Sequence, residues 1–341
     1  MGKLYSTFAI SFVILLIINL VFISLTLYAW AASSLQQLLQ GMNLGERLYT
    51  STYIKWIILA DFIWIGSVLV FLFSRKHYKT DYQKHYLTNN PIEHPKVCVI
   101  IPTYNEDLVV GDIVNDYKNQ KFVEEVIVID NHSTDKTVEI AKQCGARVIT
   151  KKENKGYSHS CYVGLKEALK TDANIIVLTE CDGTFDAKDI QKMIMYLDNC
   201  DMVIGTRQIQ VLSEKGNQNS MFYVWGNLFL AKLLQLKYFS LLHMGIVNLT
   251  DVGCSYRAIR LDSLEKIITK FDLPNAQKVI HNEKNWLFTI FLTMLGIEND
   301  LKIIEIPITF KKRKGMSKSQ SQKKKKGIAY GFKFMWFIIS S

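Results

Sequence analysis

The sequence lacks closely spaced cysteine pairs, although it contains six cysteines in 341 residues. They are scattered along the chain as Cys98, Cys144, Cys161, Cys181, Cys200 and Cys254. Without a C-x-x-C pair, the usual ligand spacing of a structural zinc site is missing. Several of these cysteines lie in apolar stretches, where a thiol is ordinary core material. This use of cysteine is typical of a reducing compartment.

Acidic residues are absent from residues 311–341, which contain ten lysines and arginines. The net charge of +10 comes from this arm, because the first 310 residues hold 31 basic and 31 acidic side chains. A basic arm can bind nucleic acid, anionic lipid or a phosphorylated substrate. The sequence has no recognised nucleic-acid-binding motif, and this favours lipid or phosphate over nucleic acid.

Two long apolar runs, 8–31 and 54–73, dominate the N-terminal part of the chain. A helix of about 24 residues measures roughly 36 Å, enough to cross a bilayer. We therefore expect residues 1–74 to form a two-helix transmembrane hairpin, which could also join two copies of the chain. Basic residues are concentrated after the second run, so the positive-inside rule predicts a multi-pass membrane protein with its main domain on the cytoplasmic face.

The stretch 75–95 is polar and is expected to be a linker. Short apolar runs then alternate with helical patterns. The expected strands are 97–101, 126–129, 147–150, 175–178 and 202–204, and the expected helices are 136–144, 157–170 and 188–197. This alternation predicts an α/β domain over 96–320, with a mostly parallel sheet and helices on both faces.

Three later segments complete the pattern. Residues 301–310 resemble a strand, and Pro307 places it at a sheet edge. Residues 221–249 are rich in aromatic and aliphatic side chains, and we expect an amphipathic helix there, with a third membrane span as the alternative. Residues 327–339 predict an interfacial helix within a basic and aromatic segment, 321–341, that contacts membrane lipids; the alternative is a C-terminal core helix.

Glu180 and Asp182 follow the apolar strand 175–178 directly. Residues two apart in extended chain point the same way, so both carboxylates can face one point beyond the end of the strand. Ligands bind at this edge of an open α/β sheet. Two hard oxygen ligands there suit Mg²⁺ or Mn²⁺. A solvated acidic turn is the alternative.

Polar residues also follow other expected strands, as PTYNE at 102–106, DNHSTD at 130–135 and GTR at 205–207. Polar clusters at the same edge of one sheet predict one shared site rather than separate solvated loops.

The motifs VIIPTYNE, IDNHSTDKT, NKG, TECDGTFD, IGTR, DVGCSYRAIR and PITFKKRKGMSKS occur in this order over about 97–320. In this order they resemble family 2 glycosyltransferases of the GT-A fold, most closely the dolichyl- or polyprenyl-phosphate mannosyltransferases. The resemblance implies a Rossmann-like GT-A domain. It assigns nucleotide-sugar binding to Pro102, Tyr104, Glu106, Asp130, Gly156 and Arg207. The two N-terminal runs are not part of the family pattern.

The resemblance also assigns the metal site to Glu180 and Asp182, where the family usually has Asp-x-Asp. Thr184 and Asn131 stand where stronger ligands or a second acid are frequent. We expect cationic side chains to contact the phosphates, because a guanidinium group binds phosphate oxygens with two parallel hydrogen bonds. The resemblance implies that Arg313, Ser317 and Lys318 bind the acceptor and its phosphate, and that Asp182, Asp251 and Arg257 are catalytic. For each cation the alternative is a surface charge.

The resemblance implies an inverting, metal-dependent transfer of sugar from GDP-mannose or a UDP-sugar to a polyprenyl or dolichyl phosphate. A hydroxyl of a lipid-linked glycan is the alternative acceptor. A hydroxyl would need a carboxylate base, and Asp251 and Glu283 are the candidates. Two other classes stay open: a nucleotide-binding membrane protein without activity, and a nucleotidyltransferase, which would release pyrophosphate.

Overall fold

The structure, a computed structural model, describes residues 14, 16–25, 27, 28, 31, 32, 52–74, 89–214, 221–238, 248–281, 287–314 and 324–341. The chain divides into two compact units, one of Met1–Tyr78 with Ile339–Ser341 and one of Lys79–Ile338. The second unit contains the sheet and all the residues discussed below as a site.

The first unit contains helical residues between 14 and 32 and helix α3, Thr52–Ser74. The Asn19 side chain donates a hydrogen bond to Asp61 Oδ1 at 2.7 Å. Across the described residues, no helix combines the length and the apolar character that a membrane crossing requires. This finding contradicts the predicted multi-pass localisation and its transmembrane hairpin. Polar side chains interrupt both apolar runs, Asn19 in the first and Lys55 and Asp61 in the second.

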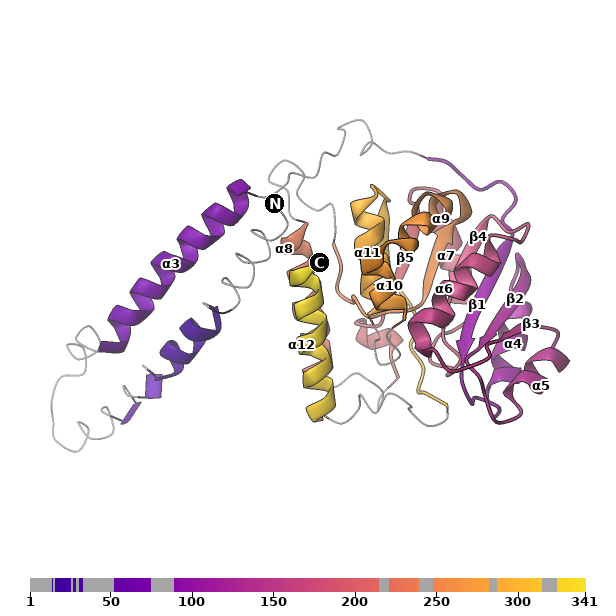
Figure 1. Cartoon of the computed structure of the whole chain (residues 1–341), viewed down its shortest axis with the longest axis horizontal. Helices are drawn as coiled ribbons and strands as arrows, with labels where there is room; N and C mark the ends of the chain where they lie inside the picture. The colour runs from indigo at the N-terminus through magenta and orange to yellow at the C-terminus, as the bar shows by residue number, and fades with distance from the viewer. Residues whose placement is uncertain are drawn as a thin grey trace. The chain divides into compact units, whose positions relative to one another are not determined.

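The described residues of the second unit form a seven-stranded sheet in the order β3-β2-β1-β4-β6-β5-β7 (Figure 1). The strands are β1 Val97–Thr103, β2 Val123–Asp130, β3 Arg147–Thr150, β4 Ile175–Leu178, β5 Met202–Thr206, β6 Arg257–Arg260 and β7 Ile303–Pro307. Neighbours are parallel except β6, which runs antiparallel to both β4 and β5. The predicted α/β class with a mostly parallel sheet is confirmed, and β7 lies at an edge as expected.

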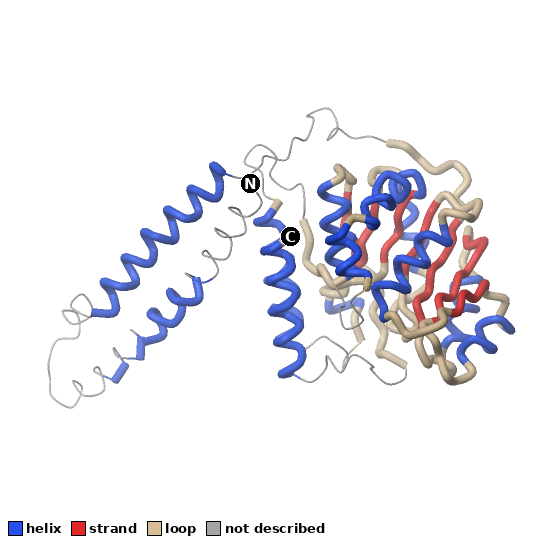
Figure 2. The backbone as a smooth tube through the Cα atoms, in the orientation of Figure 1, coloured by secondary structure: helices blue, strands red, loops and turns tan. Residues whose placement is uncertain are grey.

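Strands β1 and β4 are almost entirely apolar, in keeping with a sheet whose two faces are both covered. Every residue of β1 and β4 is buried, as expected for parallel strands between two layers of helices. The helices are α4 Val110–Lys118, α5 Thr137–Gln143, α6 Gly156–Ala168, α7 Asp189–Leu197, α9 Leu261–Ile268, α10 Pro274–Ile280 and α11 Phe288–Glu298, with short 3₁₀ turns at Gln210–Leu212 and Thr269–Asp272. Helices α4 and α5 pack together, whereas α6 packs with α10 and α11 (Figure 2).

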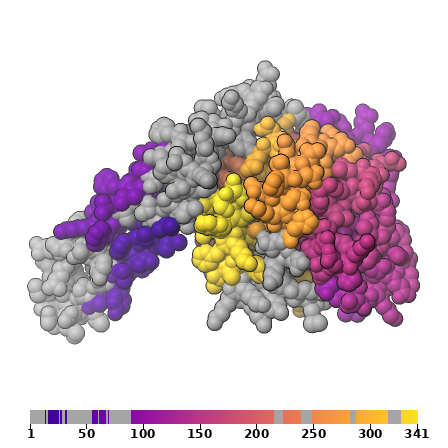
Figure 3. Space-filling view, viewed as in Figure 1, coloured from indigo at the N-terminus to yellow at the C-terminus, as the bar shows by residue number. Residues whose placement is uncertain are grey.

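Two further apolar helices, α8 Met221–Lys237 and α12 Lys324–Ser340, belong to the two segments predicted to be amphipathic. Lys237 Nζ donates a hydrogen bond to the Ile338 carbonyl at 2.8 Å, which joins the C-terminal ends of the two helices. Figure 3 shows α12 on the face of the molecule turned to the viewer. Residues 239–247, part of the segment expected to be helical, lie outside the described residues.

The order of the strands positions the site. The chain moves outward from β1 through β2 to β3 and then returns across β1 to β4. Between β1 and β4 the strand order reverses, and the loops that follow these two strands diverge there, which leaves a crevice in such folds. The carboxyl ends of β1, β2, β4 and β5 share one edge of the sheet, since these strands are parallel.

Candidate active site

Glu180 and Asp182 stand in the turn that follows β4, and both side chains line one cavity of about 770 Å³. Gly183 follows with φ 73°, a conformation that favours glycine, and turns the chain sharply after the two acids. Asp182 is buried and Glu180 is half-buried. Loss of solvent around Glu180, followed by the charge of Asp182, raises the pKa of Glu180 above its usual range. The two acids are therefore close enough for the charge of Asp182 to oppose ionisation of Glu180.

Each acid is held by a hydroxyl group. Ser255 donates to Glu180 Oε1 at 2.5 Å. Thr184 donates to Asp182 Oδ1 through its hydroxyl at 2.6 Å and its backbone N–H at 3.0 Å. The other oxygen, Asp182 Oδ2, lies 3.1 Å from a guanidinium nitrogen of Arg313. Hydroxyl donors thus fix one oxygen of each acid, and Asp182 presents the other to a cation.

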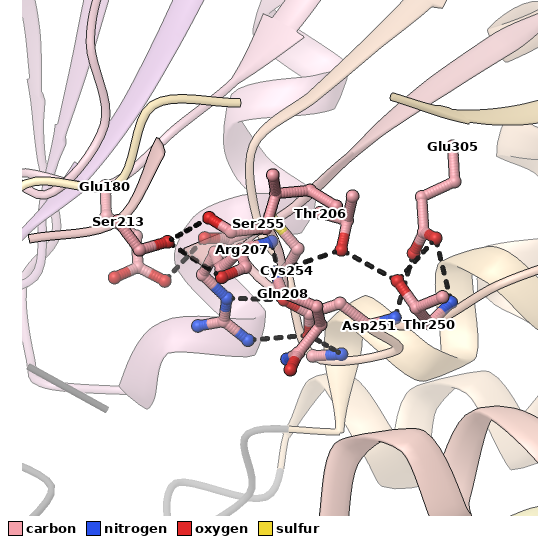
Figure 4. Close-up of polar contacts among 12 residues, drawn as sticks. Glu180, Thr206, Arg207, Gln208, Ser213, Thr250, Asp251, Cys254, Ser255 and Glu305 are labelled. Carbon is pink, nitrogen blue, oxygen red and sulfur yellow. Dashed lines mark hydrogen bonds and ion pairs between the residues drawn. The ribbon is translucent and has the colours of Figure 1, made fainter. Parts of the chain in front are cut away.

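Arg207, which follows β5, is held by Asp251 in a two-point ion pair (Figure 4). Its Nε lies 2.6 Å from Asp251 Oδ2, and a terminal nitrogen lies 2.8 Å from Oδ1. Burial opposes both charges, but the pair outweighs it: the pKa of Arg207 is raised and that of Asp251 is lowered. Glu305 accepts hydrogen bonds from the Asp251 backbone N–H and from Thr250, each at 2.8 Å. This chain of contacts aims Arg207 at the cavity, which it lines.

The loops after β1 and β2 are hydrogen-bonded to each other. Ser133 accepts a hydrogen bond from the Asn105 N–H, and Thr137 accepts one from the Glu106 N–H, each at 2.8 Å. Asp130 is fully buried and accepts from the Ser133 N–H at 3.1 Å. These bonds hold Glu106 at the cavity wall.

The cavity brings together many of the predicted site residues but not all. Those that line it are Pro102, Tyr104, Glu106, Gly156, Glu180, Asp182, Arg207 and Arg313. Asp130, Asp251 and Arg257 are fully buried and stand behind the lining. Ser317, Lys318 and Glu283 lie outside the described residues.

Arg257 begins β6 and makes contacts within the protein core. Its Nε donates to the Cys254 carbonyl at 2.9 Å, and a terminal nitrogen donates to Thr293 at 2.8 Å. Burial lowers the pKa of Arg257 to about 10. These contacts tie the loop before β6 to α11, and the predicted catalytic role of Arg257 stays a prediction.

Several lining residues were given no role from the sequence. Asn131 donates to Asn154 Oδ1 at 2.6 Å, and both line the cavity near Gly156. Asn227 lines it from α8, where it is a polar residue in an apolar helix, and that contrast is a signal readable in the sequence. Most residues from Gly327 to Met335 of α12 also line it, whereas the sequence suggested an interfacial helix or a C-terminal core helix there.

The carboxylate ligands available in the cavity are of the type that a hard divalent cation prefers. Glu180 and Asp182 supply carboxylate oxygens, the ligands that Mg²⁺ and Mn²⁺ prefer. Among the residues that the structure describes, no group of three or more histidine, cysteine, aspartate or glutamate side chains could hold a metal. Two carboxylates are enough where substrate phosphates complete the coordination.

Comparison with known protein families identifies the family of this chain. The family described as "Glycosyl transferase family 2" matches residues 98–268, about half of the chain. The chain belongs to glycosyltransferase family 2. This glycosyltransferase carries the acids and arginines of its site at the ends of the strands that the family match includes, with Arg313 beyond it.

Relatives of this glycosyltransferase include two whose names join mannose to a polyprenol or to undecaprenyl phosphate. Polyprenol monophosphomannose synthase of Mycolicibacterium smegmatis is 27% identical over 65% of this chain and 80% of its own. Undecaprenyl-phosphate mannosyltransferase of Micrococcus luteus is 25% identical over 64% of this chain and 84% of its own.

A solved structure shares the fold. It is glucosyl-3-phosphoglycerate synthase from Mycobacterium tuberculosis in complex with Mn²⁺, uridine diphosphate and glucosyl-3-phosphoglycerate, with a TM-score of 0.50. It is 16% identical and covers 72% of this chain and 80% of its own. The likeness supports the GT-A-like fold.

Proposed function

We propose that this glycosyltransferase moves a sugar from a nucleotide-diphosphate sugar, GDP-mannose or a UDP-sugar, to a polyprenyl or dolichyl phosphate, with inversion at the anomeric carbon. One observation carries the proposal: a single cavity joins charged groups at the sheet edge with an apolar wall. The charged part includes Glu180, Asp182 and Arg207, and the apolar part includes Leu230 of α8 and Phe334 of α12. A sugar diphosphate needs the first part and a prenyl chain needs the second.

The donor would bind along the loops after β1 and β3. Pro102, Tyr104 and Glu106 would contact the base and ribose, with Gly156 beside them. Asp130 would contribute from behind the cavity lining. Both of its oxygens accept from the Ser133 N–H, and this holds the loop after β2 in shape. The hydrogen bonds between the loops after β1 and β2 support a wall that is ordered before the donor binds.

Glu180 and Asp182 would hold Mg²⁺ or Mn²⁺, and the bound ion would neutralise the diphosphate leaving group. Arg207 and Arg313 would add positive charge to the same phosphates. Asp251 would serve as a positioning residue, since both of its oxygens are taken by Arg207. A guanidinium held at two points is oriented before the substrate arrives, and that preorganisation favours the transition state.

A phosphate acceptor agrees with the carboxylates of the cavity better than a hydroxyl acceptor does. Within the described lining, Glu180 is bonded to Ser255, whereas Asp182 and Glu106 share Arg313. A hydroxyl acceptor needs a positioned base, and each of these acids already has a partner. An alkyl phosphate is already an anion at neutral pH and needs no deprotonation. The geometry thus supports transfer to a lipid phosphate.

The test presents the full-length protein with several labelled nucleotide sugars, one at a time, together with a polyprenyl phosphate and Mg²⁺ or Mn²⁺. We expect label from one donor to enter the organic phase, with release of a nucleoside diphosphate. Label that enters only longer glycans would support the hydroxyl acceptor instead. Release of pyrophosphate would contradict sugar transfer and indicate a nucleotidyltransferase.

A further inference from the structure

Two asparagine side chains, Asn131 and Asn154, are hydrogen-bonded to each other in the wall of the cavity. Asn131 follows β2 and Asn154 follows β3, and both line the cavity together with Gly156, the first residue of α6. The Asn131 amide nitrogen donates to Asn154 Oδ1 at 2.6 Å. We call these two residues the amide pair.

Backbone N–H groups fix the orientation of both amides. The Lys155 N–H donates to Asn131 Oδ1 at 3.1 Å, and the Gly156 N–H donates to Asn154 Oδ1 at 3.0 Å. A backbone N–H can be accepted by the oxygen of an amide but not by its nitrogen, so neither side chain can be turned over. Asn154 Oδ1 thus accepts two bonds and has no further lone pair to offer.

The amide nitrogen of Asn154 is left to bind a ligand. Among the residues that the structure describes, none accepts a hydrogen bond from this nitrogen, although the side chain lines the cavity. Gly156 has φ 80°, a conformation that favours glycine, and this turn brings its N–H onto the Asn154 oxygen. The amide pair therefore presents a hydrogen-bond donor, and not an acceptor, to a molecule in the cavity.

The amide pair lies where the base of a bound nucleotide would reach. In the sheet, β1 separates β2 and β3 from β4, which precedes the two acids. The Asn131 N–H donates to the Thr103 carbonyl at 2.9 Å, which joins the pair to the loop after β1. Pro102 and Tyr104 of that loop line the cavity as well. A nucleotide with its diphosphate at the acids would extend its base toward the ends of β2 and β3.

Carboxylates that could accept hydrogen bonds from a base are already engaged. Within the described lining, Glu180 accepts from Ser255, and Glu106 and Asp182 share Arg313. Asp130 is fully buried behind the lining. A base rich in N–H donors would therefore find few acceptors here, and each donor left unmatched costs binding free energy.

We propose that Asn154 selects the base of the sugar donor and that this base is uracil. Uracil has a carbonyl oxygen on each side of its single N–H, and the Asn154 amide can donate to one of them. Guanine has one carbonyl next to its N1–H and 2-amino group, and the amide pair has no acceptor for these two groups. The donor would accordingly be a UDP-sugar. This inference rests on the proposed function and narrows its donor.

The test measures the binding of UDP and of GDP to the full-length protein by calorimetry, with Mn²⁺ and without any lipid acceptor. Wild type is compared with Asn154→Asp. One oxygen of the new carboxylate can still accept from Asn131 and Gly156, so the loop keeps its bonds, while the other oxygen presents an acceptor to the base. The matched control is Asn115→Asp, the same change at an exposed position of α4 outside the described lining.

We expect wild type and Asn115→Asp to bind UDP about tenfold more tightly than GDP, a ratio that corresponds to about 1.4 kcal/mol. In Asn154→Asp the added charge should weaken both nucleotides, but guanine gains an acceptor and uracil loses a donor. The ratio of the two dissociation constants should therefore fall to about one or reverse.

The outcomes separate this inference from the proposed function. Loss of both nucleotides by the same factor in Asn154→Asp would show that the residue only shapes the loop, and would overturn the inference. Tighter binding of GDP by wild type would also overturn it, while leaving sugar transfer in place. Failure to bind either nucleotide would overturn both. Selective binding of UDP without transfer to a lipid phosphate would support the inference and contradict the proposed acceptor.

Discussion

A guanidinium nitrogen of Arg313 lies 3.1 Å from Asp182 Oδ2, and the other terminal nitrogen lies 3.6 Å from Glu106 Oε1. The side chain is 21% exposed and bridges the loop after β1 to the acidic turn after β4. The Lys314 N–H also donates to the Asp182 carbonyl at 2.9 Å, which fixes the chain next to this arginine. Arg313 thus neutralises the carboxylate oxygen that would otherwise be offered to a metal ion.

Replacing Arg313 tests whether its charge serves the reaction. Arg313→Met should lower kcat/KM for sugar transfer by about 100-fold, the cost of one preorganised donor at a developing charge. Arg313→Lys should have a kcat/KM between those of wild type and Arg313→Met, since lysine keeps the charge but cannot bridge two carboxylates with a planar guanidinium group. Binding of Mn²⁺ without donor should be at least as tight in Arg313→Met, because the competing cation is gone. Wild-type kcat/KM in Arg313→Met would contradict this role.

Asp251→Asn separates a positioning role from a base. The substitution weakens the two-point hold on Arg207, and we expect kcat to fall by about 100-fold, as for misplacement of a catalytic group. The pH–rate profile should keep its shape, because Asp251 does not exchange a proton with the acceptor. Loss of the acid limb of that profile in Asp251→Asn would instead identify a base. Arg207→Lys is the companion variant and should lower kcat without changing the profile.

The same ion pair predicts how stability depends on pH. Arg207 lowers the pKa of Asp251 in the folded protein despite burial, and an unfolded aspartate titrates near pKa ~3.9. The stabilisation is therefore present above about pH 4 and is lost as pH falls through the folded pKa. Arg207→Met leaves a buried carboxylate unpaired and should cost about 3–5 kcal/mol at pH 7, with the difference shrinking as the pH falls and this carboxylate takes up a proton.

Denaturant unfolding between pH 3 and pH 8 provides the measurement for this pair. The matched control is Lys96→Met, which removes an exposed ion pair of 3.8 Å with Glu124 and should change the free energy of unfolding by less than about 1 kcal/mol. An equal effect of the two substitutions would show that the Arg207–Asp251 pair adds no more than a surface pair.

Replacement by alanine is expected to have opposite effects on stability at two helical glycines. A Cβ at Gly164 of α6 would lie 2.2 Å from Ile100 Cγ2 of β1, whereas one at Gly331 of α12 would meet no atom within 4 Å. Gly164→Ala should destabilise the fold by about 1–3 kcal/mol through overpacking. Gly331→Ala should stabilise it by about 0.5–1 kcal/mol, because alanine favours the helix. Unfolding midpoints check both, and a tolerated Gly164→Ala would contradict the close packing of α6 on β1.

The parts of the fold that the sequence predicts are those with local signals. Continuous β-branched runs mark β1 and β4, and the alternation with helices yields the parallel sheet. Strand β6, with the sequence RAIR, has no such signal. It owes its place to partners far along the chain, since Arg257 pairs with Leu178 on one side and Ile204 on the other. Pairing across such distances is a tertiary effect that local patterns do not contain.

The candidate site shows the same division. Glu180, Asp182 and Arg207 follow strand ends, so their place at the sheet edge can be predicted from the pattern. The pairing of Arg207 with Asp251 cannot, because the two are 44 residues apart and the intervening chain folds back through α8. Likewise, α12 lines the cavity from the far end of the sequence, and only packing of the whole domain brings it there.

The proposed reaction requires that one cavity hold the two acids, the donor phosphates and a lipid phosphate acceptor. The most direct measurement compares transfer of labelled sugar to a polyprenyl phosphate and to the polyprenol of equal chain length, by wild type and by Asp182→Asn, with and without Mn²⁺. We expect labelled lipid only from the phosphate and only with the metal, and about 100-fold less of it from Asp182→Asn. Equal use of the polyprenol, or wild-type rates from Asp182→Asn, would contradict it.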